Sequence, residues 1–288
     1  DVLPSEVMTI TGKAAGPTAD FLRFVSESPV TGRIDHFTDG MRAEGNGSLD
    51  LRLVMPLRKM DDSTVRGDYR FTANRLWLLD GLPPLEAAGG RLSFTEDTLS
   101  IPEARAQALG APLRLVARTE ADGNVRFEAD GAASLGAVRA GWPQAADWPV
   151  VDHLSGSAPW KADVRISRGG TQVVVTSSLE GVSASLPAPF NKPASDAWPL
   201  RVAFGRPTGG GPPSLDVELG DRLSARLRRD AGSTEWHGGV GILQPVRVAD
   251  KGVMVSAEFD TLDVDAWRRA LASEGAEPAE TEAATPAE

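Results

Sequence analysis

The sequence predicts an all-β protein. Apolar and polar residues alternate over many short stretches, turn-forming residues separate these stretches, and few segments have the period of an amphipathic helix. In residues 45–57, GNGSLDLRLVMPL, the side chains of Leu49, Leu51, Leu53 and Met55 fall on alternate positions. A strand here has one apolar face, because successive side chains point to opposite sides of a sheet. The central question is what covers that face.

The alternation recurs along the chain. VRGDYRFT (65–72) places Val65, Gly67, Tyr69 and Phe71 on one side and polar residues on the other. Further strands are expected at 91–94, 113–117, 124–131, 160–166, 171–181, 199–204, 214–220, 222–230 and 253–259. Turn residues such as Asp122-Gly123-Asn124 and Gly169-Gly170, and Pro/Gly-rich loops at 185–199 and 207–213, connect them. The spacing favours roughly a dozen antiparallel strands.

Two short helices are predicted. Residues 16–29 contain Thr18 as a candidate N-cap, followed by an apolar stripe of Phe21, Leu22, Phe24 and Val25. Residues 263–275 form the second helix, with Asp263 or Asp265 as its cap and Gly275 at its end. Residues 273–288 carry five Glu and no Lys or Arg, which is typical of a disordered tail or linker. Two short helices cannot cover a dozen strands.

Composition and charge argue against several classes of protein. The chain has 288 residues, a net charge of -10 and no cluster of Lys and Arg with interleaved aromatic residues, so nucleic acid is not an expected partner. The lack of cysteine excludes disulfides and Cys-ligated zinc. No apolar run approaches the roughly 18 to 20 residues that a membrane-spanning helix needs.

Motifs for chemistry are weak. The three histidines are His36, His153 and His237, and no G-x-S-x-G nucleophile motif occurs, so we predict no enzyme, no cofactor and no metal. Trp236-His237-Gly238-Gly239 is interpreted as a strand with a bulge. Asp260, Asp263 and Asp265 lack the spacing of an EF-hand and favour helix capping. Glycosidase carboxylates stay open as an alternative, because they can lie far apart in a chain.

The apolar face therefore has three candidate covers. It can pack on a second sheet in a sandwich, close on itself as a barrel, or stay open as a groove that is filled by something other than protein, such as lipid acyl chains. Alternation does not distinguish these architectures, because all three require the same pattern.

Several ordered blocks resemble a known family. They are GNGSLDLRLVMPL, VRGDYRFTANRL, LPPLEAAGGRLSFTEDTL, LGAPL at 109–113, LSGSAPWKADV at 154–164 and SSLEGVSASLPAPFNKPA at 177–194. Within them, Leu82-Pro83-Pro84-Leu85 precedes Gly90, Ser155-Gly156-Ser157 precedes Pro159-Trp160, and Leu186-Pro187-Ala188-Pro189 precedes Lys192. The chain is similar to the YhdP branch of the AsmA-like proteins, best over residues 10–205.

The resemblance implies an internal periplasmic segment of a long bacterial envelope protein that is anchored in the inner membrane. The implied fold is an extended, twisted antiparallel sheet that forms an open apolar groove over residues 1–272, with a subdivision near 140–155; a β-sandwich scaffold is the alternative. The implied function is to shield phospholipid acyl chains during transport between the inner and outer membranes. Expected partners are phospholipid and envelope membrane proteins at the ends of the full-length chain.

The candidate groove-lining residues are the apolar positions of the predicted strands: Leu49, Leu51, Leu53, Met55, Tyr69, Phe71, Leu92, Phe94, Val125, Phe127, Trp160, Val164 and Ile166.

Overall fold

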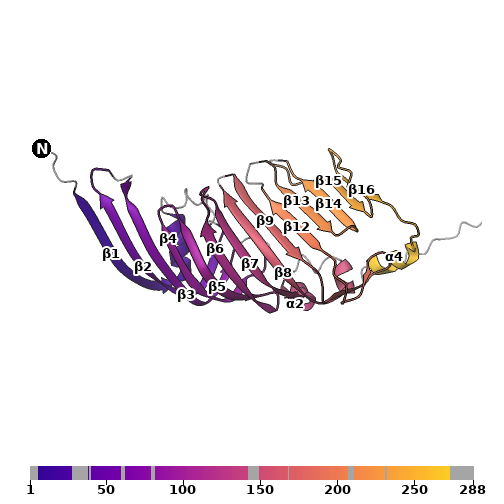
Figure 1. Ribbon diagram of the computed structural model, residues 1–288, viewed down its shortest axis with the longest axis horizontal. Helices are drawn as coiled ribbons and strands as arrows, with labels where there is room; N and C mark the ends of the chain where they lie inside the picture. Colours follow the sequence, from indigo (N-terminus) through magenta and orange to yellow (C-terminus); the bar gives the residue numbers. More distant parts are fainter. Residues whose placement is uncertain are drawn as a thin grey trace, which may run out of the picture.

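The computed structural model describes residues 6–27, 38, 40–59, 62–78, 82–141, 149–167, 169–206, 211–230 and 232–272. These residues form one open, twisted sheet of 16 strands with three short α-helices (Figure 1). The all-β prediction is confirmed, and the sandwich alternative is wrong, because every described strand belongs to this single sheet. The predicted tail at 273–288 and the C-cap at Gly275 lie outside the described residues.

The sheet begins with nine strands, which are β1 (Val7–Pro17), β2 (Arg42–Pro56), β3 (Thr64–Trp77), β4 (Leu85–Thr95), β5 (Leu99–Ala108), β6 (Ala111–Thr119), β7 (Val125–Ser134), β8 (Leu154–Ser167) and β9 (Gly170–Ser177). Shorter strands follow: β10 (Val182–Ser185), β11 (Asn191–Lys192), β12 (Leu200–Gly205), β13 (Ser214–Leu219), β14 (Leu223–Arg228), β15 (His237–Ile242) and β16 (Val253–Ala257). The helical elements are α1 (Thr18–Ser26), α2 (Leu135–Gly141), η2 (Pro149–His153) and α4 (Val264–Leu271).

Most strands pair with their neighbour in sequence, so the sheet is a series of antiparallel hairpins. The short strands β10 and β11 branch off, because β8 pairs with β9 through its later residues and with β10 through Leu154–Gly156. At the far end β16 runs parallel to β15, which differs from the antiparallel expectation. The connecting chain passes close to β15 at Gly239, where a Cβ would lie 1.9 Å from the carbonyl oxygen of Arg247. A crossover of this kind lets the next strand enter in the same direction.

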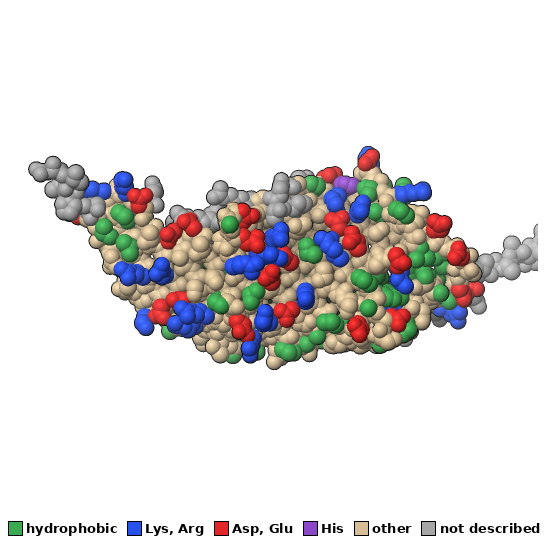
Figure 2. All heavy atoms as spheres, viewed as in Figure 1, with side chains coloured by type: hydrophobic (Ala, Val, Ile, Leu, Met, Phe, Trp, Pro, Cys, Tyr) green, Lys and Arg blue, Asp and Glu red, His purple; other side chains and the backbone are tan. Residues whose placement is uncertain are grey.

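The strand register sorts the side chains onto two faces. Residues that are directly opposite in neighbouring strands point to the same side of the sheet. Leu51 is opposite Gly12 and Gly67, and Phe127 is opposite Ala117 and Val164, so apolar side chains form continuous rows across the strands. We call this side the apolar face. The other side, the charged face, carries most of the Arg, Lys, Asp and Glu side chains of the strands, and Figure 2 shows it.

The apolar face is curved into a trough between β3 and β8. Phe71 of β3 and Trp160 of β8 both pack against the same buried cluster of Ala88, Ala106 and Leu113, which lies on the strands between them. Register shifts in the pairing of β2 through β6 mark bulges, and bulges bend strands. Small residues of this cluster form the floor of the trough, and Phe71 and Trp160 pack on it from the two sides.

The N-termini of the two predicted helices, α1 and α4, differ in how they are capped. Asp263 caps α4 as predicted, since its side chain accepts a hydrogen bond from the backbone N–H of Ala266 at 2.9 Å. Thr18 is not the N-cap of α1: Pro17 occupies that position, and Thr18 is the first helical residue. The hydroxyl of Thr18 instead accepts hydrogen bonds from side chains of the sheet. Helix α2, which has seven residues and contains two glycines, was not predicted from the sequence.

Strands β1 and β5 were also missed. Their sequences, VMTITGKAAGP and LSIPEARAQA, alternate apolar and polar residues, but most of the apolar positions are Ala or Gly, which have little intrinsic preference for strands. Both pair with long neighbours, β1 with β2 over its whole length and β5 with β4 and β6. Pairing with a neighbour, rather than local propensity, therefore determines their conformation.

Candidate functional site

The predicted lining residues all lie on the apolar face, in two groups. The first group, on β2, β3 and β4, comprises Leu49, Leu51, Leu53, Met55, Tyr69, Phe71, Leu92 and Phe94. The second group, on β7 and β8, comprises Val125, Phe127, Trp160, Val164 and Ile166. Apart from Tyr69 and Ile166, which are each 5 % exposed, these side chains are half-buried. Neighbours on the same face bury most of each side chain, and the remainder is exposed.

The apolar face also continues onto β9, β12, β13 and β14, which was not predicted from the sequence. Rows run through Val173 or Val175 into β12 at Phe204 or Val202, and on into β13 at Leu215 or Val217. The alternation in PLRVAF and SLDVEL was a usable signal for these residues. TQVVVT carried none, because its three consecutive valines read as apolar on both faces.

One helix covers part of the apolar face. The ring of Phe21 on α1 stacks on Tyr69 with ring centroids 4.1 Å apart, and it lies 6.4 Å from the ring of Phe94. In Figure 1, α1 lies behind the first strands, on the side away from the viewer. Two predicted lining residues, Tyr69 and Phe94, therefore contact protein on their outer side. Burial raises the pKa of the Tyr69 hydroxyl, because the phenolate form loses hydration there.

A small buried polar cluster anchors this helix. The Tyr69 hydroxyl donates to Thr18 Oγ1 at 2.8 Å, and the Asn74 side-chain amide donates to the same oxygen at 2.5 Å. Asn74 is completely buried. The glycines of the GNG sequence make room for this cluster: a Cβ on Gly47 would lie 2.1 Å from the Tyr69 oxygen, and one on Gly45 would lie 2.3 Å from Asn74 Oδ1. These glycines therefore make the docking of α1 possible.

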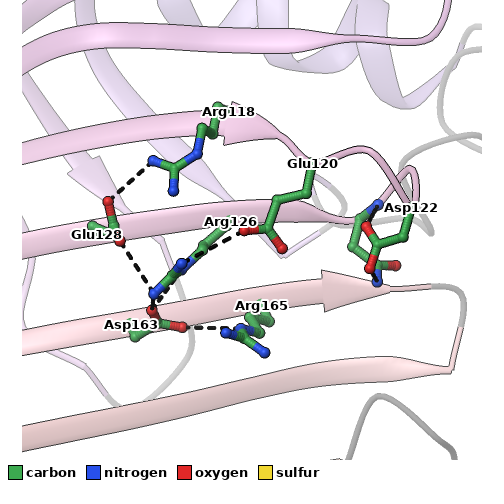
Figure 3. A network of polar contacts seen from close by, with 8 residues as sticks. Arg118, Glu120, Asp122, Arg126, Glu128, Asp163 and Arg165 are labelled. Carbon is green, nitrogen blue, oxygen red and sulfur yellow. Dashed lines mark hydrogen bonds and ion pairs between the residues drawn. The ribbon is translucent and has the colours of Figure 1, made fainter.

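The charged face is held by ion pairs that cross the strands (Figure 3). Arg118 contacts Glu128 at 3.1 Å, Glu128 contacts Arg126 at 3.2 Å, and Arg126 in turn pairs with Asp163. Asp163 also contacts Arg165 at 3.4 Å. The hydrogen bond that Arg126 donates to Asp163 raises the pKa of Arg126. Such pairs keep this side of the sheet hydrated, so the two sides have opposite solvent preferences.

One depression lies mainly on the charged face. Its volume is about 870 Å³, and its lining includes Pro159, Lys161, Thr176 and Arg201, which share that side of β8, β9 and β12. Trp160 and Leu200 of the apolar face also line this depression.

Polar chemistry is sparse in the described segments. His153 Nε2 lies 2.8 Å from the carbonyl oxygen of Ala270 and so connects η2 to α4, while His237 begins β15. His36 lies outside the described residues. Among the residues that the structure describes, no three His, Asp or Glu side chains are grouped as a metal site requires. The feature of these residues that can bind a ligand extensively is the apolar face.

Comparisons with known proteins agree with the resemblance noted from the sequence. In the described ranges no helix has both the length and the apolar character needed to cross a membrane. No curated protein and no solved structure matches the chain. The family model described as YhdP protein matches residues 2–288. The chain therefore belongs to the YhdP family.

Proposed function

We propose that this segment shields phospholipid acyl chains on its apolar face while lipid moves between the inner and outer membranes. Membership of the YhdP family supports a role in bridge-like lipid transport. The observation that carries the proposal is the continuous apolar face of a single open sheet, over which the described residues place no second sheet. The periplasm, the inner-membrane anchor of the full-length protein and its envelope partners are parts of the same proposal.

The energetics favour a long apolar surface for this task. An acyl chain of about 15 methylene groups loses roughly 12 kcal/mol of favourable free energy when it is exposed to water, at about 0.8 kcal/mol per group. The charged headgroup costs far more to bury than to leave hydrated. A trough that is open on one side meets both requirements, because the chains lie on the sheet and the headgroup stays in water.

The dimensions are also suitable. The main path of the sheet contains 14 strands. With neighbouring strands about 4.8 Å apart, the path is roughly 60 Å long, which is several times the width of a phospholipid. Because α1 occupies the face near Tyr69 and Phe94, we place the lipid mainly over β6 to β14. The residues expected to contact acyl chains are Val125, Phe127, Val164, Val175, Val202 and Val217.

Two neighbouring valines of β9 provide a matched test. Val175 is on the apolar face, opposite Ala162 and Val202, whereas Val174 is on the charged face, opposite Asp163. Val175→Asp should reduce binding of a fluorescent phospholipid and the phospholipid that co-purifies in native mass spectrometry. Val174→Asp should leave both unchanged, because its carboxylate lies on the charged face, where Arg165 and Arg201 in the same small depression offset the repulsion by Asp163. Equal lipid binding by the two folded variants would contradict the proposal.

A further inference from the structure

The charged face has an uneven distribution of charge over its first four strands. In a chain of net charge -10, the three neighbouring rows of this face that contain Ser48, Asp50 and Arg52 of β2 carry five cations and only two acids. The cations are Lys13, Arg52, Arg66, Arg70 and Arg91, and the acids are Asp50 and Asp68. In Figure 2, Lys and Arg side chains gather over these strands at the lower left of the molecule.

Both acids already form ion pairs with three of these cations, Lys13, Arg70 and Arg91. Asp50 contacts Arg70 at 2.9 Å and Lys13 at 3.3 Å, and Asp68 contacts Arg91 at 2.8 Å and Ser93 at 2.6 Å. Hydrogen bonds from Arg70 and Lys13 lower the pKa of Asp50, and those from Ser93 and Arg91 lower the pKa of Asp68. Both acids are therefore ionised near neutral pH and already paired with these cations.

The two remaining cations, Arg52 and Arg66, are directly opposite each other in the β2–β3 pair. Both side chains are exposed, and neither has an ion-pair partner among the described residues. Like charges in directly opposed positions destabilise a sheet, because their Cβ atoms are only about 5 Å apart. The β7–β8 pair avoids this problem where Arg126 meets Arg165, since Asp163 contacts both. No such acid serves Arg52 and Arg66 in the described part of the chain.

Hydroxyl side chains extend this row at both ends. Thr11 of β1 is opposite Arg52, and Thr95 of β4 is opposite Arg66, so the row reads Thr11, Arg52, Arg66, Thr95 across four strands. Guanidinium groups present paired N–H donors that match the oxygens of phosphate, and the Thr11 hydroxyl supplies a further donor, whereas the Thr95 hydroxyl already contacts that of Thr98 at 2.7 Å. A multivalent anion between the two arginines would remove their mutual repulsion.

We propose that Arg52 and Arg66 bind a phosphate group on the charged face. A carboxylate offers two oxygens and one negative charge, whereas phosphate offers more oxygens and can contact two guanidinium groups at once. The phosphate can come from a phospholipid headgroup at a bilayer surface or from a free phosphate compound. This site is on the opposite side of the sheet from the apolar face and does not depend on the lipid groove.

Thermal unfolding with added inorganic phosphate tests the site. In phosphate-free buffer of constant ionic strength, millimolar phosphate should raise the melting temperature of the unmodified segment, because a ligand that binds the folded state stabilises it. Without phosphate, Arg66→Gln should raise the melting temperature, because it removes the repulsion between the two arginines. It should also raise the phosphate concentration needed for half-saturation by about tenfold or more, because one of the two phosphate ligands is lost. Arg66→Glu should pair with Arg52 and abolish the phosphate response.

Arg201→Gln is the matched control. It removes an exposed arginine that likewise has no ion-pair partner among the described residues, from the same face but on β12. It should keep the full phosphate response, which separates binding at Arg66 from the general stabilising effect of phosphate on proteins.

Vesicles distinguish the two sources of phosphate. If the unmodified protein sediments with phosphatidylglycerol vesicles and Arg66→Gln does not, the natural source of the phosphate is a headgroup at a bilayer surface. If the protein responds to inorganic phosphate but does not bind the vesicles, the source is a free phosphate compound. The proposal is wrong if the unmodified segment responds to neither probe, or if Arg66→Gln responds as strongly as the unmodified segment does.

Discussion

Substitution of Val202 by Asp distinguishes an open trough from a packed core. Val202 is half-buried on the apolar face between Val175 and Val217, whereas Leu113 is 6 % exposed beneath Phe71 and Trp160. In lipid-free protein the carboxylate of Val202→Asp can reach water. It should cost about 2 to 3 kcal/mol of unfolding free energy, from lost apolar contact and the weak strand preference of Asp. Leu113→Asp buries its carboxylate without a partner and should cost at least about 4 kcal/mol.

Urea unfolding of both lipid-stripped variants measures this difference. Added phospholipid should then stabilise the unmodified segment and Leu113→Ala, which retains the apolar surface, but not Val202→Asp. If Val202→Asp fails to fold, or costs as much as Leu113→Asp, the face at β12 is packed against protein and the trough is wrong at that strand.

Two further predictions concern the parts that support the trough. Tyr69 is the single tyrosine of the chain, so its ionisation can be followed by ultraviolet absorbance. Its pKa should lie above the ordinary value of about 10, and Phe21→Ala should move the pKa back toward that value. An unchanged pKa in Phe21→Ala would mean that α1 does not bury the hydroxyl. Because the folded-state pKa is raised, this group should lower stability as the pH rises above about 10. Lys192 Nζ donates to the carbonyl oxygens of Leu179, Val182 and Pro193, so Lys192→Met should cost about 2 to 4 kcal/mol in thermal or urea unfolding; a loss below about 1 kcal/mol would show that these carbonyls find other donors.

Alternation in the sequence predicted the strands that carry their own signal. GNGSLDLRLVMPL and VRGDYRFT became β2 and β3 with the predicted residues on one face, because period-two alternation is a property of each strand alone. Strands β1 and β5 alternate too, but most of their apolar positions are Ala or Gly, which indicate a strand only weakly, and their conformation also depends on hydrogen bonds to neighbours that are defined only in the folded chain. The role of Thr18 was predicted wrongly for a similar reason: a capping residue and a residue that hydrogen bonds to Tyr69 and Asn74 look the same in sequence.

The sequence by itself determined that one side of each strand is apolar and the other polar, since the order of side chains along a strand decides both. Only the tertiary structure decided what that apolar side meets. Packing against another sheet and packing against lipid require the same residues, so the difference depends on whether a second layer lies across the face. The register of the strands and the docking of α1 on Tyr69 leave the face as one open sheet that a helix partly covers. Arg52 and Arg66, which have no ion-pair partner in the described part of the chain, could likewise be recognised as neighbours only from the alignment of β2 and β3, because the two residues are distant in sequence and adjacent across the sheet.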